Sequence, residues 1–496
     1  MMDLRRGCLV VLGSLFILLP NLVSANVVFK VQSKFAAARE RTLPSLKAHD
    51  DRRHGRRLAA VDLPLGGNGS PTDTALYYTK IGIGTPPKDY YVQVDTGSDI
   101  MWVNCAGCDK CPTKSDLGVE LRLYDPNGST TGTSLTCDQD FCIETFNPSG
   151  CTVGSACPYG VTYGDGSSSM GYFVKDNIQL DRASGNLQTT PMNGSVAFGC
   201  GAKQSGQLGS SSQALDGILG FGQANSSMIS QLASVGKVKK MFAHCLDGTN
   251  GGGIFAIGQL VEPKLNSTPL VPNQAHYNVI LKAIEVGHDV LQLPTDVLES
   301  GKAVVIDSGT TLAYLANDLF TPLMDKIMAA QPDLKLHTVE QQFTCFQFNG
   351  NVDNGFPAVN FRFENSLSLT IVPSEYLFQL RSKTMDNVWC VGWQNGGMQS
   401  KDGKELTLLG GPLITNELID LMDNDMVLSN KLVLYDLENQ TIGWAKYNCS
   451  SSVKVRDDPS GQEYLIGYHD LASASNRNTG WTLTLLLLLA ILGSFI

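Results

Sequence analysis

Two stretches of the chain decide its fold. Residues 90–98 read YYVQVDTGS and residues 303–310 read AVVIDSGT. Each is an apolar run that ends in Asp, then Ser or Thr, then Gly, then Ser or Thr, and the two aspartates lie 212 positions apart. An apolar pair followed by Gly lies downstream of each run, at 218–220 and at 408–410. This internal repeat predicts that the body of the protein consists of two related lobes.

The sequence around the two stretches predicts an all-β protein. Short alternating or wholly apolar runs follow one another, separated by Gly, Asn, Ser and Pro. Helices are expected only over 226–235 and 319–330. Pro and Asn residues near 269–274 suggest a boundary, so we expect an N-terminal β lobe with a cysteine-rich insert and a flap over 77–270, and a C-terminal β lobe over 275–448.

The repeated motif brings together the residue types that acid–base chemistry needs. A buried strand delivers each aspartate to a tight turn, the glycine lets the backbone bend, and the hydroxyl that follows can hold one carboxylate oxygen. If the two loops face each other, the carboxyl groups of Asp95 and Asp307 come within about 3 Å and share one proton. The ionised member can then activate a water molecule, while the protonated member polarises a carbonyl group. Such a pair titrates as a unit. Either motif alone is more often an ordinary turn, but the pair, in register with a repeat, favours catalysis.

Over residues 77–448 these motifs make the chain resemble the pepsin-like aspartic endopeptidases, and within them the plant nepenthesin-like members. The resemblance implies a bilobal fold of two pseudo-twofold-related β lobes with the active site in the cleft between them. It also implies polypeptide substrates and neither cofactor nor metal, and we expect a monomer. Matched position by position, it implies a catalytic pair (Asp95, Asp307), residues that support the pair (Thr96, Gly97, Ser98, Ser308, Gly309, Thr310), a flap (Tyr163, Gly164) and a flap partner (Trp102).

The flap has support of its own, because residues 161–167 read VTYGDGS, a Gly-rich hairpin tip between strand-like residues that could close over a substrate. Taken singly, Tyr163 and Trp102 would be ordinary strand and core residues.

Composition and charge narrow the class of protein. The chain has 496 residues, of which 17% are charged, and a net charge of −10. An acidic protein does not neutralise phosphates, so a nucleic-acid partner is disfavoured. The charge is unevenly distributed, since residues 1–25 contribute +1 and residues 26–60 contribute +6, which leaves −17 on the remainder.

The N-terminal segment predicts export. Residues 1–25 carry two arginines followed by an apolar run, as in a secretory signal peptide. A membrane anchor is the alternative, but the run over 8–19 is shorter than the ~20 residues that a span needs. The basic residues 26–60, with RRHGRR at 52–57, are interpreted as a propeptide with a processing site; a disordered basic arm is the alternative.

The C-terminal segment predicts a glycosylphosphatidylinositol (GPI) anchor. Small residues at 473–475, a polar spacer over 476–480 and an apolar tail over 481–496 form the pattern of an attachment signal whose tail is removed. We expect attachment at Ser473, with Ser475 and Asn476 as rival positions, a linker or stalk over 449–480, and display on the outer face of the plasma membrane. A tail-anchored helix is the alternative.

The cysteines and sequons fit an exported protein. Of 13 cysteines, Cys8 leaves with the signal, and the remaining even number favours disulfides over a zinc site at Cys105, Cys108 and Cys111. The resemblance implies that Cys345 pairs with Cys390. Partners stay open for Cys105, Cys108, Cys111, Cys137, Cys142, Cys151, Cys157, Cys200, Cys245 and Cys449. Asn-x-Ser/Thr glycosylation signals occur at Asn68, Asn127, Asn193, Asn225, Asn266, Asn439 and Asn448.

Residues 412–424, PLITNELIDLMDN, depart from the pattern of the family and are interpreted as an insertion that could disrupt the second lobe. The leading hypothesis is an acid-acting aspartic endopeptidase that is made as a zymogen. A catalytically silent two-lobed binding or inhibitor-like protein is the alternative, and it is disfavoured because both aspartates and their neighbouring hydroxyls are present.

Overall fold

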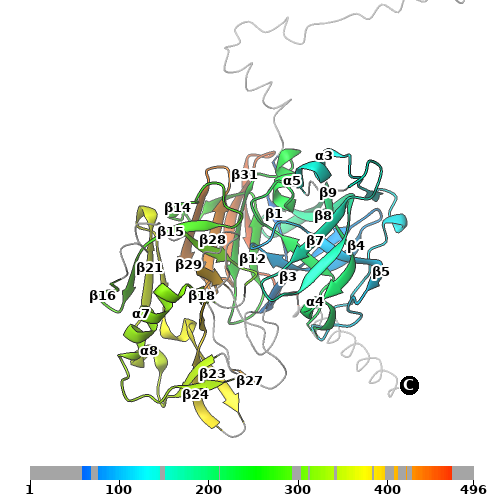
Figure 1. Ribbon diagram of the computed structural model, residues 1–496. Coiled ribbons are helices and arrows are strands. Elements are labelled where there is room, and N and C mark those ends of the chain that lie inside the picture. The colour runs from blue at the N-terminus through cyan, green and yellow to red at the C-terminus, as the bar shows by residue number, and fades with distance from the viewer. Residues whose placement is uncertain are drawn as a thin grey trace, which may run out of the picture. The chain divides into compact units, whose positions relative to one another are not determined.

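The computed structural model describes residues 58–68, 76–145, 151–211, 213–292, 303–310, 313–339, 343–382, 385–396, 407–410, 420–421 and 427–471. These residues form a mostly β structure of two lobes, as predicted, with few and short helices (Figure 1). The helices are α3 (Asp140–Thr145), α4 (Gln207–Ser210), α5 (Met228–Ser234), α7 (Asn317–Met328) and α8 (Val352–Gly355). Both helices expected from the sequence are present, as α5 and α7. Within the described residues, none of the helices has the length and apolar character that crossing a membrane requires.

A 15-stranded sheet forms the N-terminal lobe and continues into the strands that join the lobes. Its longest strands, β8 and β9, pair antiparallel over 18 residues each. The strands are β1 (Val61–Asp62), β2 (Leu65–Asn68), β3 (Leu76–Ile83), β4 (Lys88–Asp95), β5 (Trp102–Asp109), β6 (Thr133–Ser134), β7 (Pro158–Thr162), β8 (Ser168–Gly185), β9 (Gln188–Ser205), β10 (Gly217–Gly220), β11 (Met241–Leu246), β12 (Gly253–Ile257), β14 (Ser267–Pro269), β28 (Lys431–Asp436) and β29 (Thr441–Lys446).

The C-terminal lobe contains an 8-stranded and a 5-stranded sheet, with α7 and α8 beside them (Figure 1). The 8-stranded sheet consists of β15 (Asn278–Val286), β16 (Asp289–Val290), β17 (Ala303–Asp307), β18 (Ala313–Leu315), β21 (Val359–Phe363), β22 (Ser368–Ile371), β25 (Trp393–Asn395) and β26 (Thr407–Gly410). The 5-stranded sheet consists of β19 (His337–Val339), β20 (Phe343–Gln347), β23 (Leu377–Ser382), β24 (Met385–Val391) and β27 (Asp420–Leu421).

The sequence repeat reappears as a repeated strand pairing. In the N-terminal lobe β10 lies parallel to β4, so that Gly220 stands opposite Asp95. In the C-terminal lobe β26 lies parallel to β17, and Gly410 stands opposite Asp307 in the same register. The apolar-Gly runs are therefore the parallel neighbours of the two aspartate-bearing strands. They are buried throughout, as strands covered on both faces should be.

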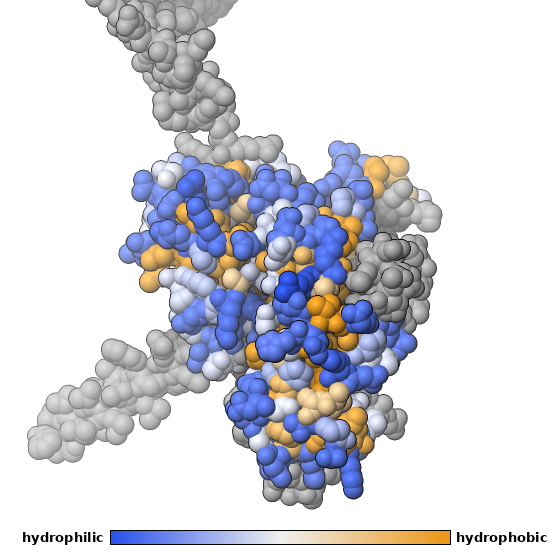
Figure 2. All heavy atoms as spheres, turned by 90° about the vertical axis from the view of Figure 1, so that its left-hand side faces the viewer, coloured by the Kyte–Doolittle hydropathy of each residue, from blue (hydrophilic) through white to orange (hydrophobic). Residues whose placement is uncertain are grey.

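The lobes share a boundary that the sequence did not predict. Strands β28 and β29 belong by sequence to the C-terminal range 275–448, yet β28 pairs with β11 of the large sheet. A single sheet thus runs across the junction, with β28, β29 and β12 lying between the two lobes in Figure 1. Apolar side chains fill the core on both sides, while the face drawn in Figure 2 is mostly hydrophilic with small apolar patches.

The sequence predicted a linker over 449–480, and this prediction is wrong for residues 452–467, which form strands. A third sheet joins β13 (Gln259–Glu262), β30 (Ser452–Asp457) and β31 (Gln462–Gly467), so residues 452–467 form a packed hairpin. The alternation in SVKVRD buries Val453 and Val455 on one face, which is a strand pattern. The predicted attachment position, Ser473, lies outside the described residues.

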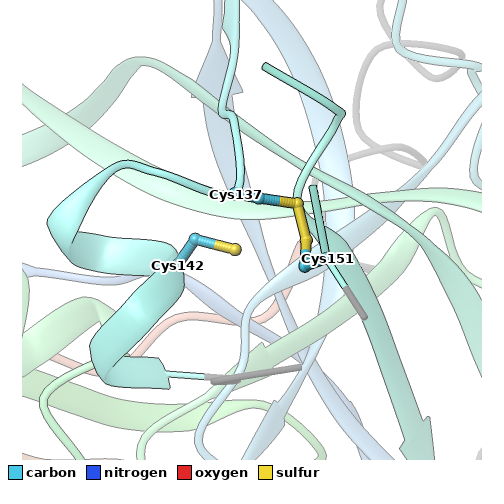
Figure 3. A group of neighbouring side chains, drawn as sticks. All are labelled: Cys137, Cys142 and Cys151. Atoms are coloured by element: carbon cyan, nitrogen blue, oxygen red, sulfur yellow. A yellow bond between two sulfur atoms is a disulfide. The ribbon is translucent and has the colours of Figure 1, made fainter. Parts of the chain in front are cut away.

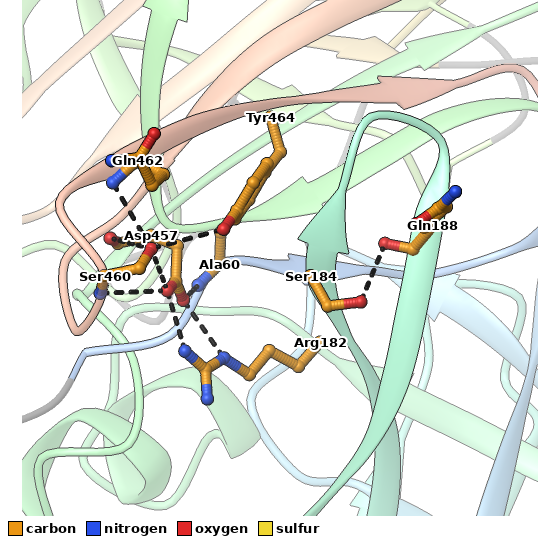
Figure 4. A network of polar contacts seen from close by, with 8 residues as sticks. All are labelled: Ala60, Arg182, Ser184, Gln188, Asp457, Ser460, Gln462 and Tyr464. Atoms are coloured by element: carbon orange, nitrogen blue, oxygen red, sulfur yellow. Dashed lines mark hydrogen bonds and ion pairs between the residues drawn. The ribbon is translucent and has the colours of Figure 1, made fainter.

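The hairpin also holds the N-terminal end of the folded body (Figure 4). Buried Asp457 accepts a backbone N–H from Ala60 and forms an ion pair with Arg182 at 2.7 Å. Burial acts to raise the pKa of Asp457, but hydrogen bonds from Arg182 and Ser460 outweigh it and the pKa is lowered. Leu58–Ala60, the last residues of the predicted propeptide, are thus packed against the folded body, and the boundary at residue 60 stays a prediction. The rest of the predicted propeptide lies outside the described residues.

All cysteines after Cys8 form disulfides, and the pair implied by the resemblance, Cys345–Cys390, is present. The pairs left open by the sequence are Cys105–Cys200, Cys108–Cys111, Cys137–Cys151, Cys142–Cys157 and Cys245–Cys449. In the insert, the sulfur atoms of Cys137, Cys142 and Cys151 lie within 4.8 Å of one another (Figure 3). Because all three are disulfide-bonded, they offer no thiolate, which is the form of cysteine that binds metals.

Candidate active site

The two aspartates end equivalent strands and have equivalent surroundings. Asp95 is the last residue of β4 and Asp307 the last residue of β17, and each is 6% exposed. Around Asp95, the Gly97 N–H donates to Oδ1 at 2.8 Å and the Ser98 hydroxyl donates to Oδ2. The turn after Asp95 thus holds both oxygens of its carboxylate. The bond from the Ser98 hydroxyl is the one that the sequence predicted.

The turn after Asp307 repeats this arrangement. Gly309 N–H donates to Oδ1 of Asp307 at 2.8 Å, and the Thr310 hydroxyl donates to Oδ2 at 2.6 Å. The two carboxylates therefore accept the same pair of hydrogen bonds, and their strands pair in the same register. This is how the sequence repeat appears in the folded protein.

The glycines bring the carboxyl groups together. A Cβ atom on Gly97 would overlap the carboxyl group of Asp307, and one on Gly309 would overlap that of Asp95. Each loop is therefore packed directly against the carboxyl group of the other lobe, which only glycine permits. Burial, and then the charge of Asp307, raise the pKa of Asp95 well above its usual range. Two carboxyl groups this close cannot both ionise easily, so the pair holds a proton in acid.

One hydroxyl links the two aspartate loops. Thr96, next to Asp95, accepts the backbone N–H of Ser308 at 2.8 Å. The converse bond is missing in the described structure, where the hydroxyl of Ser308 has no partner. The two interlobe hydroxyls matched by resemblance are thus not equivalent, and Thr96 alone provides the cross-link.

The flap lies over the N-terminal aspartate. Strands β7 and β8 form its hairpin, and Gly164 lies in the exposed turn between them. Trp102 Nε1–H donates to the Tyr163 hydroxyl at 2.7 Å. Burial, then the charge of Asp95, raise the pKa of Tyr163. The hydroxyl of Tyr163 also interacts with Ser98, so the flap touches the residue that holds Asp95.

Sequence reasoning missed one side chain at this site. Tyr435 of β28 is fully buried, and its hydroxyl interacts electrostatically with the side chain of Thr96. Its only sequence signal is a place in the apolar run LVLYD, which marks a strand but not a site.

Comparison with known proteins decides the family. Residues 77–259 match the family described as xylanase inhibitor N-terminal, and residues 276–446 match xylanase inhibitor C-terminal. Aspartic proteinase 36 of Arabidopsis thaliana is 50% identical over 479 residues, which cover 96% of this chain and 95% of the relative. The chain belongs to the plant aspartic proteinases. Aspartic proteinase 39 of the same plant is 48% identical over 95% of both chains. Because both matches extend over nearly the whole chain, the proteinase is an aspartic endopeptidase.

More distant proteins share the fold. Aspartic proteinase nepenthesin-2 of Nepenthes gracilis is 27% identical over 76% of this chain and 78% of its own. The crystal structure of basic 7S globulin from soybean is 21% identical, covers 78% of the proteinase and 96% of the globulin, and superposes with a TM-score of 0.57. At that identity the likeness supports the two-lobed β fold alone.

Proposed function

We propose that this proteinase hydrolyses peptide bonds at acidic pH, with Asp95 and Asp307 as its general acid and base. The observation that carries the proposal is the reciprocal packing of Gly97 and Gly309 against the opposite carboxyl groups. It brings the two groups near enough to share one proton, and that proton is present only where the solution is acidic enough to supply it.

The chemistry follows from that shared proton. The ionised carboxylate takes a proton from a water molecule while the water oxygen bonds to the carbonyl carbon, and the protonated carboxyl donates to the carbonyl oxygen. The C–N bond then breaks, the amine leaves with the proton that the first carboxylate took, and one hydroxyl of the tetrahedral intermediate returns its proton to the second carboxylate, which restores the pair. The hydroxyls of Ser98 and Thr310 fix the outer carboxylate oxygens, and Tyr163, held by Trp102, closes the flap and keeps bulk water away.

The decisive experiment is acid proteolysis of a denatured protein by the wild type, Asp95→Asn and Asp307→Asn. Both variants keep the shape of the carboxyl group but cannot supply its charge, so we expect cleavage to stop. Ser374→Ala, which removes an exposed hydroxyl bound to Asp353 far along the chain, is the control and should cleave normally. Equal cleavage by the wild type and both aspartate variants would refute the proposal and favour a silent binding protein.

We further propose display on the outer cell surface through a GPI lipid at Ser473, after loss of the signal and the propeptide. The basic prosegment, at +6 against a body of −17, supports a zymogen held together by charge. The asparagines of six sequons are exposed, which supports glycosylation: Asn127, Asn193, Asn225, Asn266, Asn439 and Asn448. The side chain of Asn68 lies outside the described residues. Phospholipase C specific for phosphatidylinositol should release the proteinase from plant membranes; retention after treatment would contradict the anchor.

A further inference from the structure

A buried histidine lies behind the aspartate loops. His244 of β11 is 0% exposed, and its Nε2 lies 3.2 Å from the hydroxyl of Tyr435 on the neighbouring strand β28. The two rings are 5.5 Å apart and tilted by 39°. A polar side chain is costly in such an apolar position unless its hydrogen bonds are satisfied. A histidine there therefore calls for an explanation.

The histidine is the first member of a chain of polar groups that ends at the catalytic loops. The Tyr435 hydroxyl is hydrogen-bonded to His244 on one side and interacts electrostatically with the Thr96 side chain on the other. Thr96 in turn accepts the N–H of Ser308, the residue that follows Asp307. Since the Ser308 hydroxyl has no partner in the described structure, this chain leads to the one hydroxyl that links the two aspartate loops.

The unpartnered atom of His244 indicates the direction of the bonds. Its Nδ1 has no partner among the described residues. A buried N–H without an acceptor is rarer than a buried acceptor without a donor, which favours the tautomer with its proton on Nε2. Nε2–H then donates to the Tyr435 oxygen, and the Tyr435 hydroxyl is free to donate to Thr96.

Burial keeps the ring in this neutral form. It lowers the pKa of His244 to about 3, so the imidazole stays uncharged over most of the acidic range. A protonated ring would place a second N–H donor, on Nδ1, where the described structure offers no acceptor.

We propose that His244 is a positioning residue for the aspartate pair: it orients the Tyr435 hydroxyl toward Thr96, and so fixes the cross-link that holds the two aspartate loops in register. The inference rests on the proposed function of Asp95 and Asp307. His244 touches neither aspartate nor substrate in this role, and it acts only through Tyr435 and Thr96. The chemical requirement at position 244 is one N–H donor in place of Nε2.

The test compares substitutions that keep or remove this donor. His244→Gln retains an N–H donor, on an amide at the end of a side chain of similar reach, and His244→Leu has no donor there. Tyr435→Phe removes the hydroxyl that lies between His244 and Thr96. We expect His244→Leu and Tyr435→Phe each to lower kcat roughly ten-fold with KM within two-fold, because a small misplacement of catalytic groups is costly and the substrate contacts are unchanged. His244→Gln should recover kcat to within about three-fold of the wild type.

Two further variants separate positioning from general destabilisation. The double variant His244→Leu with Tyr435→Phe should be no slower than either alone, since both break the same chain. Tyr124→Phe is the matched control: Tyr124 is also a buried tyrosine, but its hydroxyl donates to Asp176 and not to an aspartate loop. It should lower the melting temperature and leave kcat unchanged.

The outcomes are distinguishable from failure of the proposed function. If Asp95→Asn retains activity, the proposed function fails whatever position 244 does. If Asp95→Asn is inactive while folded Tyr435→Phe has the kcat of the wild type, only the positioning role is overturned. A Gln variant as slow as the Leu variant, or additive losses in the double variant, would also overturn it. Should His244→Leu not fold, the nearly isosteric Tyr435→Phe carries the test.

Discussion

Replacing His244 by Gln should flatten the acid dependence of stability of this proteinase. Burial lowers the pKa of this side chain from 6.5 to about 3 in the folded state. The folded protein therefore binds fewer protons at this site than the unfolded chain. The stability that neutral His244 contributes is complete above about pH 6.5 and is lost as the pH falls toward 3.

The magnitude follows from the difference in pKa. One pKa unit corresponds to about 1.4 kcal/mol, and between pH 7 and pH 4 the unfolded histidine becomes charged while the buried one does not. The wild type should lose about 3 kcal/mol of unfolding free energy through this residue over that interval. Gln does not titrate, so the variant lacks this loss, and the residual pH dependence from all other groups is common to both proteins.

The assay is urea unfolding followed by tryptophan fluorescence at pH 7 and pH 4, with disulfides intact and in an Asp95→Asn background that prevents self-digestion. We expect the pH 7 to pH 4 loss to be about 3 kcal/mol smaller for His244→Gln than for its parent. The control is His337→Gln, because His337 is exposed at the start of β19 and should leave the loss unchanged. If the parent and His244→Gln lose the same stability to within about 0.5 kcal/mol, the buried neutral histidine is refuted.

Four other predictions follow from the same geometry. Trp102→Phe removes the N–H that holds Tyr163, so kcat/KM should fall roughly 3- to 10-fold, measured against Trp444→Phe, which removes an indole N–H that donates to the Ser368 carbonyl oxygen; an unchanged value would contradict the flap assignment. Asp457→Asn removes the ion pair with partly exposed Arg182 and should lower the unfolding free energy by about 1–2 kcal/mol, whereas loss of the charge on exposed Glu120 should have no measurable effect. Replacing both Cys245 and Cys449 by Ser removes a disulfide that spans 204 positions and should lower the unfolding free energy by up to about 5 kcal/mol. The control removes Cys108–Cys111, which spans 3 positions, and an equal shift in denaturant midpoint for the two variants would contradict an effect of loop entropy. Deleting residues 412–424, of which the structure describes only Asp420–Leu421 as the edge strand β27, should leave activity equal or higher, and a shortened chain that folds but loses activity would show that the segment is needed.

The sequence determined what depends on neighbouring residues. An apolar strand that ends in Asp-Thr-Gly-Ser, and again in Asp-Ser-Gly-Thr, contains its own turn and its own hydroxyl ligand. The local geometry of Asp95 and Asp307 could therefore be predicted from the residues of 90–98 and of 303–310 taken separately. Recurrence of that motif also predicted two lobes. The Gly-rich tip around Tyr163 predicted a hairpin for the same local reason.

The tertiary structure decided what depends on residues far apart in the chain. The pairing of Cys245 with Cys449 across 204 positions, the hydrogen bond from Ala60 to Asp457 across 397 positions, and the contact between His244 and Tyr435 across 191 positions have no signal in the neighbouring sequence. Strand order creates these contacts: β28 returns from the end of the chain to lie beside β11, and that return places a tyrosine behind Thr96. Hydrogen bonds between such distant groups depend on how the sheet closes, and so His244 and Tyr435 became visible as neighbours of Thr96 only in the folded protein, whereas Thr96 itself was predicted from the motif.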